Sequence, residues 1–185
     1  LNKYDKVVHC EFGSPETAAR SEHVHHAPRS FSSHLTTTAT TTAIAGPQYN
    51  VFPMPVESPN HGDRELLDDP ANPVASPFGW HDFDGEAGAD ETITFGNNVH
   101  AYADLGNDNS SAGDEPDGGI DLHFDFPLDL AADPSEYQDA AVTNLFYWCN
   151  IMHDVWYQYG FDEPAGNFQI NNYGNGGAEF DHVLA

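Results

Sequence analysis

A histidine and an aspartate stand side by side, as His153 and Asp154, within the aromatic-rich run 144–160. A buried His-Asp pair can serve as a general base, as a zinc ligand with its support, or as a hydrogen-bonded structural pair. Because no second histidine stands four residues away, as a helical metal site requires, the pattern favours the structural pair.

The polar loop at residues 104–119 is a second candidate site. Its carboxylates are the oxygen donors that Ca²⁺ prefers, but their spacing lacks the alternate ligands, central glycine and closing glutamate of an EF-hand. A calcium loop of another type and a plain solvated turn both stay open. The candidate calcium ligands are Asp104, Asp108, Asp114 and Asp117.

Two histidine patterns could also bind a metal. Residues 22–26 hold three histidines, which suit a transition metal, although their surroundings favour a histidine-rich linker. Asp121, His123 and Asp125 alternate with apolar residues, which is also the pattern of any half-buried strand. The strand is the favoured interpretation, and its inward residues would be Ile120, Leu122, Phe124 and Phe126.

A long helix is expected to carry the His-Asp pair. Asp133 is a good N-cap, Pro134 suits the first helical position, and Gly160 suits the C-terminal stop. The helical wheel is apolar on nearly every side, so we expect the helix to be buried. Its main apolar stripe consists of Val142, Leu145, Phe146, Cys149, Met152, Trp156 and Tyr159.

The other expected elements are short strands and turns. Residues 91–103 predict a β-hairpin around a Gly-Asn-Asn turn, residues 1–12 predict a strand, and the apolar residues after Phe180 predict a strand at the end of the sequence. The many prolines between residues 49 and 84 exclude long helices and central strands there. The expected fold class is therefore α+β, rich in β-structure, with one long buried helix.

Composition limits the partners. Five Lys and Arg residues against thirty Asp and Glu residues give a net charge of −25, which disfavours binding to nucleic acid and to anionic membranes. The acidity fits a solvated coat or calcium binding. Cys10 and Cys149 match no CxxC pattern, and a disulfide between them stays open.

The sequence holds no complete catalytic set. It contains no HExxH, GxSxG, P-loop or GxGxxG motif, so we assign no catalytic and no cofactor-binding residue. The chain begins with Leu1 and breaks off within an apolar run at Ala185. We therefore expect it to be part of a larger protein.

Three segments of the sequence resemble the fungalysin-type secreted metallopeptidases, the M36 family, in a bacterial form. They are QYNVFPMPVESPNHGDRELLDDPANPVASPFGWHD, TFGNNVHAYADLGNDN and AAVTNLFYWCNIMHDVWYQYGFDEPAGNFQINNYGNGG. Residues 1–12 also resemble the closing strand of that family's propeptide. The resemblance implies a propeptide strand at 1–12, a His/Thr-rich linker at 13–47, and the N-terminal part of a catalytic domain at 48–185.

The family resemblance implies a secreted zinc endopeptidase with a thermolysin-like fold, made as a zymogen and acting on proteins or peptides through zinc-activated water. Its zinc-binding HExxH helix would lie beyond Ala185, so this chain alone is expected to be inactive and to need the remainder of the peptidase domain and the propeptide. The matching helix residues supply scaffold, and Cys149 departs from the expected polar residue. The alternative is a non-catalytic acidic extracellular module that binds calcium or self-associates.

Overall fold

The computed structural model describes residues 46–111 and 113–185. The predicted strand at 1–12, most of the linker, the histidine cluster at 22–26 and Cys10 lie outside these residues. The limits of the three predicted segments therefore remain predictions.

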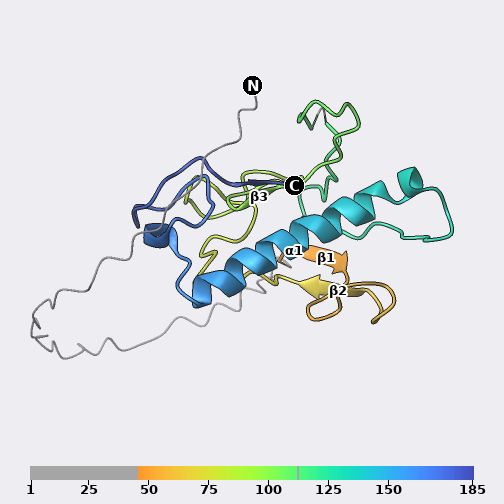
Figure 1. Cartoon of the computed structure of the whole chain (residues 1–185), viewed down its shortest axis with the longest axis horizontal. Coiled ribbons are helices and arrows are strands. Elements are labelled where there is room, and N and C mark those ends of the chain that lie inside the picture. The colour runs from red at the N-terminus through yellow and green to blue at the C-terminus, as the bar shows by residue number, and fades with distance from the viewer. Residues whose placement is uncertain (1–45, 112) are drawn as a thin grey trace, which may run out of the picture. The chain divides into compact units, whose positions relative to one another are not determined.

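One α-helix and two small sheets position the rest of the described residues (Figure 1). Strand β1 (Gln48–Val51) is the middle strand of the first sheet, between antiparallel β2 (Glu65–Asp68) and parallel β4 (His123–Phe124). The second sheet pairs β3 (Val99–His100) with β5 (Val183–Leu184) in parallel. Helix α1 (Gln138–Gln158) packs against β1 and β3.

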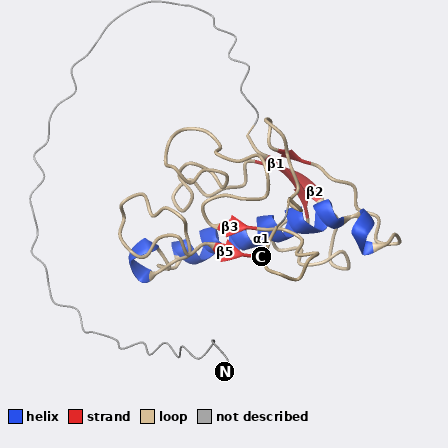
Figure 2. Cartoon of the chain, turned by 90° about the horizontal axis from the view of Figure 1, so that it is seen from above, coloured by secondary structure: helices blue, strands red, loops and turns tan. Residues whose placement is uncertain are grey.

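The α+β class is confirmed, but the strands are only two to four residues long, and loops and turns fill most of the described chain outside α1 (Figure 2). The prolines and glycines of these segments explain the short strands, since proline cannot donate a ladder hydrogen bond. No helix of the described residues is long and apolar enough to cross a membrane.

The core lies between α1 and the first sheet. At its centre the rings of Tyr49 and Phe124 stack at 5.3 Å, with the imidazole of His81 5.2 Å from Phe124. Trp80 and Phe146 pack around this stack. The remaining buried members are Val51, Val99, Ala101, Leu122, Val142, Tyr147 and Ile151.

Both ring nitrogens of His81 have partners in this core. Nδ1 lies 3.1 Å from the carbonyl oxygen of Phe95, to which it donates, so Nε2 accepts from the hydroxyl of Tyr49 at 2.8 Å. Complete burial lowers the pKa of His81 to about 4. The folded protein therefore requires the neutral imidazole.

Helix α1 begins later than predicted. Asp133 caps a 3₁₀ turn at Pro134–Glu136, where its side chain accepts from the backbone N–H of Ser135, and α1 proper starts at Gln138. The predicted stop is confirmed, because Gly160 has a φ of 91° directly after the last turn.

The expectation that α1 is buried all round is wrong. Val142, Phe146 and Ile151 are in the core, whereas the other side of the helix is open in the described structure. The apolar pattern indicates which side chains are unfavourable in water, but it does not show that other described residues bury them. The exposed apolar residues of this helix and its C-cap are Leu145, Met152, Trp156 and Tyr159.

The predicted strand around residues 120–126 shrinks to β4. The residues before β4 form a turn instead of a strand, because the N–H of Leu122 donates to the carbonyl of Gly119. Leu122 has a φ of 52°, and Ile120 is 90% exposed rather than inward. Asp121, His123 and Asp125 are exposed as predicted, which agrees with the solvent face of a strand.

The hairpin prediction is confirmed in outline. Phe95 pairs with His100, and the N–H of Gly96 donates to the carbonyl of Val99. Gly96 lies against the backbone of Trp80, where an added Cβ would come within 1.6 Å of the Trp80 carbonyl oxygen. Only glycine allows this close approach.

The neutral His81 makes stability depend on pH. Its folded pKa of about 4 lies below the ordinary histidine pKa of 6.5, so between these pH values the unfolded chain binds more protons than the folded one. The free energy of unfolding is therefore expected to fall by up to about 3 kcal/mol from pH 6.5 to pH 4. Urea denaturation at several pH values measures this slope.

His81→Gln is the control for that slope. It removes the titrating group, and it should flatten the fall between pH 6.5 and 4.5 while lowering stability at pH 7. Equal slopes in the two proteins would show that other groups cause the dependence.

Candidate functional site

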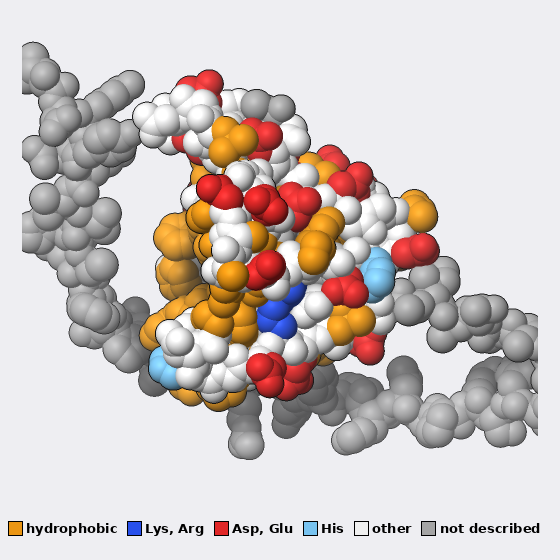
Figure 3. Space-filling view, turned by 90° about the vertical axis from the view of Figure 1, so that its right-hand side faces the viewer, with side chains coloured by type: hydrophobic (Ala, Val, Ile, Leu, Met, Phe, Trp, Pro, Cys, Tyr) orange, Lys and Arg blue, Asp and Glu red, His pale blue; other side chains and the backbone are white. Residues whose placement is uncertain are grey.

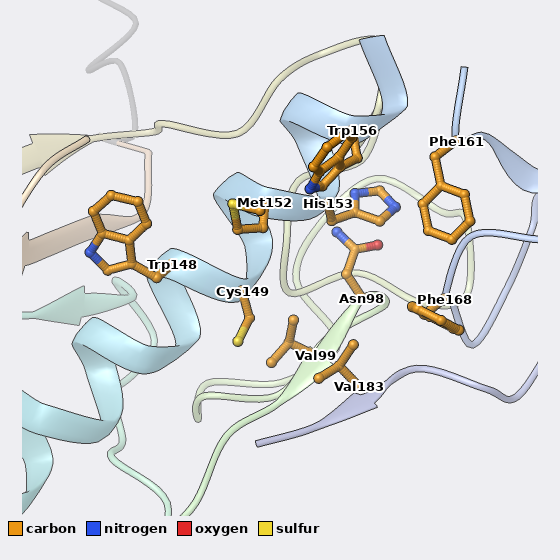
Figure 4. A pocket seen from close by; sticks show the side chains of 10 residues that line it. All are labelled: Asn98, Val99, Trp148, Cys149, Met152, His153, Trp156, Phe161, Phe168 and Val183. Atoms are coloured by element: carbon orange, nitrogen blue, oxygen red, sulfur yellow. The ribbon is translucent and has the colours of Figure 1, made fainter. Parts of the chain in front are cut away.

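The open side of α1 forms one wall of an apolar groove with a volume of about 580 Å³ (Figure 4). Helix residues line one side, β3 and β5 line another, and the segment after the helix closes the end. The lining residues are Asn98, Val99, Trp148, Cys149, Met152, His153, Trp156, Phe161, Phe168 and Val183.

Large side chains of this groove remain accessible. Trp156 is 52% exposed, Met152 43% and Phe168 48%. Leu184 of β5, the residue after Val183 of the groove wall, is also exposed. Apolar surface of this extent normally marks an interaction surface, because water contact with it is unfavourable.

The His153–Asp154 pair lies at the edge of this groove. The side chains of His153 and Asp154 are 8% and 4% exposed, as predicted for a pair within protein. Nδ1 of His153 donates to Oδ1 of Asp154 at 3.0 Å, and Nε2 lies 3.3 Å from the side-chain nitrogen of Asn167, from which it accepts. Both ring nitrogens are therefore occupied.

Asp154 connects α1 to the proline-rich segment. Its two oxygens accept from the backbone N–H of Asn72 at 2.9 Å, the hydroxyl of Ser76 at 2.8 Å and the indole N–H of Trp80 at 3.0 Å, in addition to His153. Four donors saturate the carboxylate. This arrangement supports the structural interpretation of the pair, and it leaves neither side chain a free site for a metal or a substrate proton.

Asn98 extends this network across the groove floor. Its side-chain nitrogen donates to Ser76 Oγ and to Asn150 Oδ1, each at 3.1 Å. Asn150 in turn donates to the carbonyl of Phe146. The sequence interpretation missed these two asparagines, although Asn150 stands between the apolar residues Cys149 and Ile151 of the helix, which is a usable signal for a buried hydrogen bond.

Cys149 lies half-buried in the groove wall, and burial raises the pKa of its thiol. A neutral thiol of this kind behaves as a small apolar side chain. Because Cys10 lies outside the described residues, the Cys10–Cys149 disulfide remains a prediction.

The structure brings no three of the four predicted calcium ligands together. Asp104 accepts from the N–H groups of Asp108 and Asn109, Asp108 from that of Ser110, and Asp117 from that of Gly119. In the described part of the chain, the one group of three metal-ligating side chains within mutual reach is Asp82, Asp84 and Asp90. A calcium site that includes Asp114 and its neighbours stays a prediction.

The family model described as fungalysin metallopeptidase (M36) matches residues 48–185. An extracellular metalloproteinase 5 of Trichophyton tonsurans is 39% identical over 136 residues, covering 74% of this chain and 22% of the relative. An extracellular metalloproteinase of Pyrenophora tritici-repentis is 43% identical over 137 residues, covering 73% and 20%. A probable extracellular metalloproteinase 2 of Arthroderma benhamiae is 38% identical over 149 residues, covering 76% and 22%.

These relatives are fungal, so the comparisons do not support the expected bacterial form. The chain spans about a fifth of the length of the curated relatives that it matches.

Replacing Asp154 by asparagine tests its structural role. Asparagine has one acceptor oxygen, and its side-chain nitrogen cannot accept a hydrogen bond from the donors that face the second oxygen of Asp154. About two of the four hydrogen bonds are therefore lost. We expect the free energy of unfolding to fall by about 2–4 kcal/mol in urea denaturation. Asp162→Asn is the matched control, because Asp162 caps a 3₁₀ turn through the N–H of Ala165, which asparagine can also do.

A loss below about 1 kcal/mol in Asp154→Asn, equal to that of the control, would contradict this role.

Proposed function

This chain belongs to the fungalysin (M36) metallopeptidase family, and on that premise we propose that it is the N-terminal scaffold part of a secreted zinc endopeptidase. In this proposal the protein hydrolyses peptide bonds of protein substrates with a zinc-activated water. The zinc ligands come from an HExxH helix outside the 185 residues, so the chain alone is inactive.

The apolar groove is the observation that carries the proposal. It is lined by α1, β3 and β5, which belong to the region that matches the family model. Its exposed tryptophan, methionine and phenylalanine side chains require a protein partner with an apolar surface. About four-fifths of the length of each relative lies outside the matched region. This supports the proposal that the remaining, catalytic part of the protein covers the groove.

The described residues contain no set suited to zinc. His153 has both nitrogens occupied, and His81 is enclosed in the core. The cluster of three carboxylates offers only hard oxygen ligands, whereas protein zinc sites draw mainly on imidazole and thiolate.

Reading the encoding gene in frame past the codon for Ala185 is the direct experiment. We expect the continuation to encode an HExxH motif, and a stop codon at this point would contradict the proposal. The purified 185-residue chain should not cleave casein. Cleavage that a zinc chelator abolishes would show that the chain is catalytically complete.

Trp156→Lys tests whether the groove is an internal interface of the complete enzyme. In the 185-residue chain the side chain is half exposed, and we expect the substitution to cost about 1 kcal/mol or less. In the product of the whole gene the same substitution would bury a charge, and it should cost about 3 kcal/mol or more, with loss of secreted active enzyme.

Tyr159→Lys is the matched control, because Tyr159 is 81% exposed and does not line the groove. It should be tolerated in both proteins. Equal, small effects of the Trp156 substitution in both proteins would show that the groove stays open in the enzyme.

A further inference from the structure

The loop at residues 81–90 gathers three carboxylates against the segment that follows α1. The N–H of Asp90 donates to the carbonyl of His81 at 3.0 Å and closes the loop. One carboxylate oxygen from each of Asp82, Asp84 and Asp90 lies within 4.8 Å of the other two. Two oxygens bound to the same Ca²⁺, each at about 2.4 Å, are at most about 4.8 Å apart.

One carboxylate oxygen of this cluster is buried and has no hydrogen-bond partner, which indicates a missing ligand. Asp82 is completely buried. Its Oδ1 accepts from the hydroxyl of Tyr173 at 3.0 Å and from the N–H of Gly85 at 3.1 Å, whereas its Oδ2 is buried and has no hydrogen-bond partner. A buried unpaired carboxylate oxygen is costly, so a structure that keeps one generally supplies a further ligand.

No positive side chain of the described residues neutralises the cluster. Between residues 46 and 185 the only lysine or arginine is Arg64, and its guanidinium donates to the backbone carbonyls of Asn50 and Phe126. The ion pairs of the described residues all involve histidines, and none includes these three aspartates. Burial raises the pKa of Asp82, and the charges of Asp90 and Asp84 raise it further.

From this geometry we infer that Asp82, Asp84 and Asp90 bind a calcium ion. A hard divalent cation supplies the missing partner for Asp82 and removes the repulsion among the three charges. Calcium tolerates irregular ligand sets, whereas magnesium requires near-ideal octahedral geometry. The inference does not depend on the proposed peptidase function, because it uses only contacts within the described chain.

Calcium would fix the conformation of the loop at residues 81–90, which packs against the segment after α1. The loop already contacts the segment after α1 through the side-chain nitrogen of Asn171, which donates to the carbonyl of Phe83 at 3.0 Å, and through Tyr173. The ring of Tyr173 also packs against Phe78 at 4.9 Å. Neither segment has regular secondary structure there apart from turns, so a cation bound within the loop would give it support that a sheet otherwise gives.

Calcium binding to the metal-free 185-residue chain tests the inference. Isothermal titration with Ca²⁺ alone should show one site with a Kd of about 10⁻⁴ M or tighter, and excess Ca²⁺ should raise the melting temperature. Tb³⁺ should bind in its place with emission sensitised through tyrosine, and Ca²⁺ should displace it. Wild-type chain that binds no Ca²⁺, or Mg²⁺ that displaces Tb³⁺ equally well, would overturn the assignment to calcium.

Asp84→Asn and Asp108→Asn form a matched pair of variants. Both side chains are exposed, and each accepts from the backbone N–H two residues ahead, at 2.7 Å in Asp84 and 3.1 Å in Asp108. Asparagine keeps that hydrogen bond in both. We expect Asp84→Asn to weaken Ca²⁺ binding at least tenfold and Asp108→Asn to change it less than twofold.

The metal-free melting temperature of each variant verifies that it folds, and Asp90→Asn provides a second variant of the cluster that should also weaken binding at least tenfold. Wild-type affinity in both cluster variants would overturn the proposal. Equal losses in Asp84→Asn and Asp108→Asn would also overturn it, since binding would then follow the general acidity of the surface (Figure 3).

Discussion

The carboxylate of Asp154 is the interaction on which the rest of the described structure depends. The segment between β2 and the hairpin contains three prolines and forms no strand or helix, so its path must be fixed by side chains. Asp154 fixes it at three points, namely the N–H of Asn72, the hydroxyl of Ser76 and the indole of Trp80. A buried carboxylate can hold this position only because each acceptor direction is used.

The consequences of this contact follow the chain. With its indole nitrogen satisfied, Trp80 can enter the core beside Tyr49 and Phe146. The carbonyl of Trp80 accepts a hydrogen bond from the N–H of Asn97, which fixes the position of the hairpin turn. His81, the next residue, completes the ring stack, and Asp82 then points the loop toward Tyr173. One helical side chain thus organises both the core and the carboxylate cluster.

Local signals predicted the parts of the fold that local physics decides. Gly160 marked the end of α1, and the Gly-Asn-Asn sequence marked the hairpin turn, because positive φ values and close backbone approach restrict the residue type. The pattern around Ile120 failed because Gly118 and Gly119 form a turn that alternation of polarity does not reveal. The cluster of Asp82, Asp84 and Asp90 had no signal in its spacing, since the closure of the loop brings the third residue in.

The apolar groove and the carboxylate cluster differ in the kind of partner that can satisfy them. Most aspartates of the loops use nearby backbone N–H groups, as Asp104, Asp129 and Asp133 do, so they are stable in water without cations. In the Asp82 cluster, by contrast, one buried oxygen of Asp82 has no hydrogen-bond donor. A cation would supply its partner. The groove of Trp156 needs apolar contact instead, and ions do not supply it. Calcium would therefore stabilise the loop region without covering the groove, and a protein partner would cover the groove without neutralising the cluster.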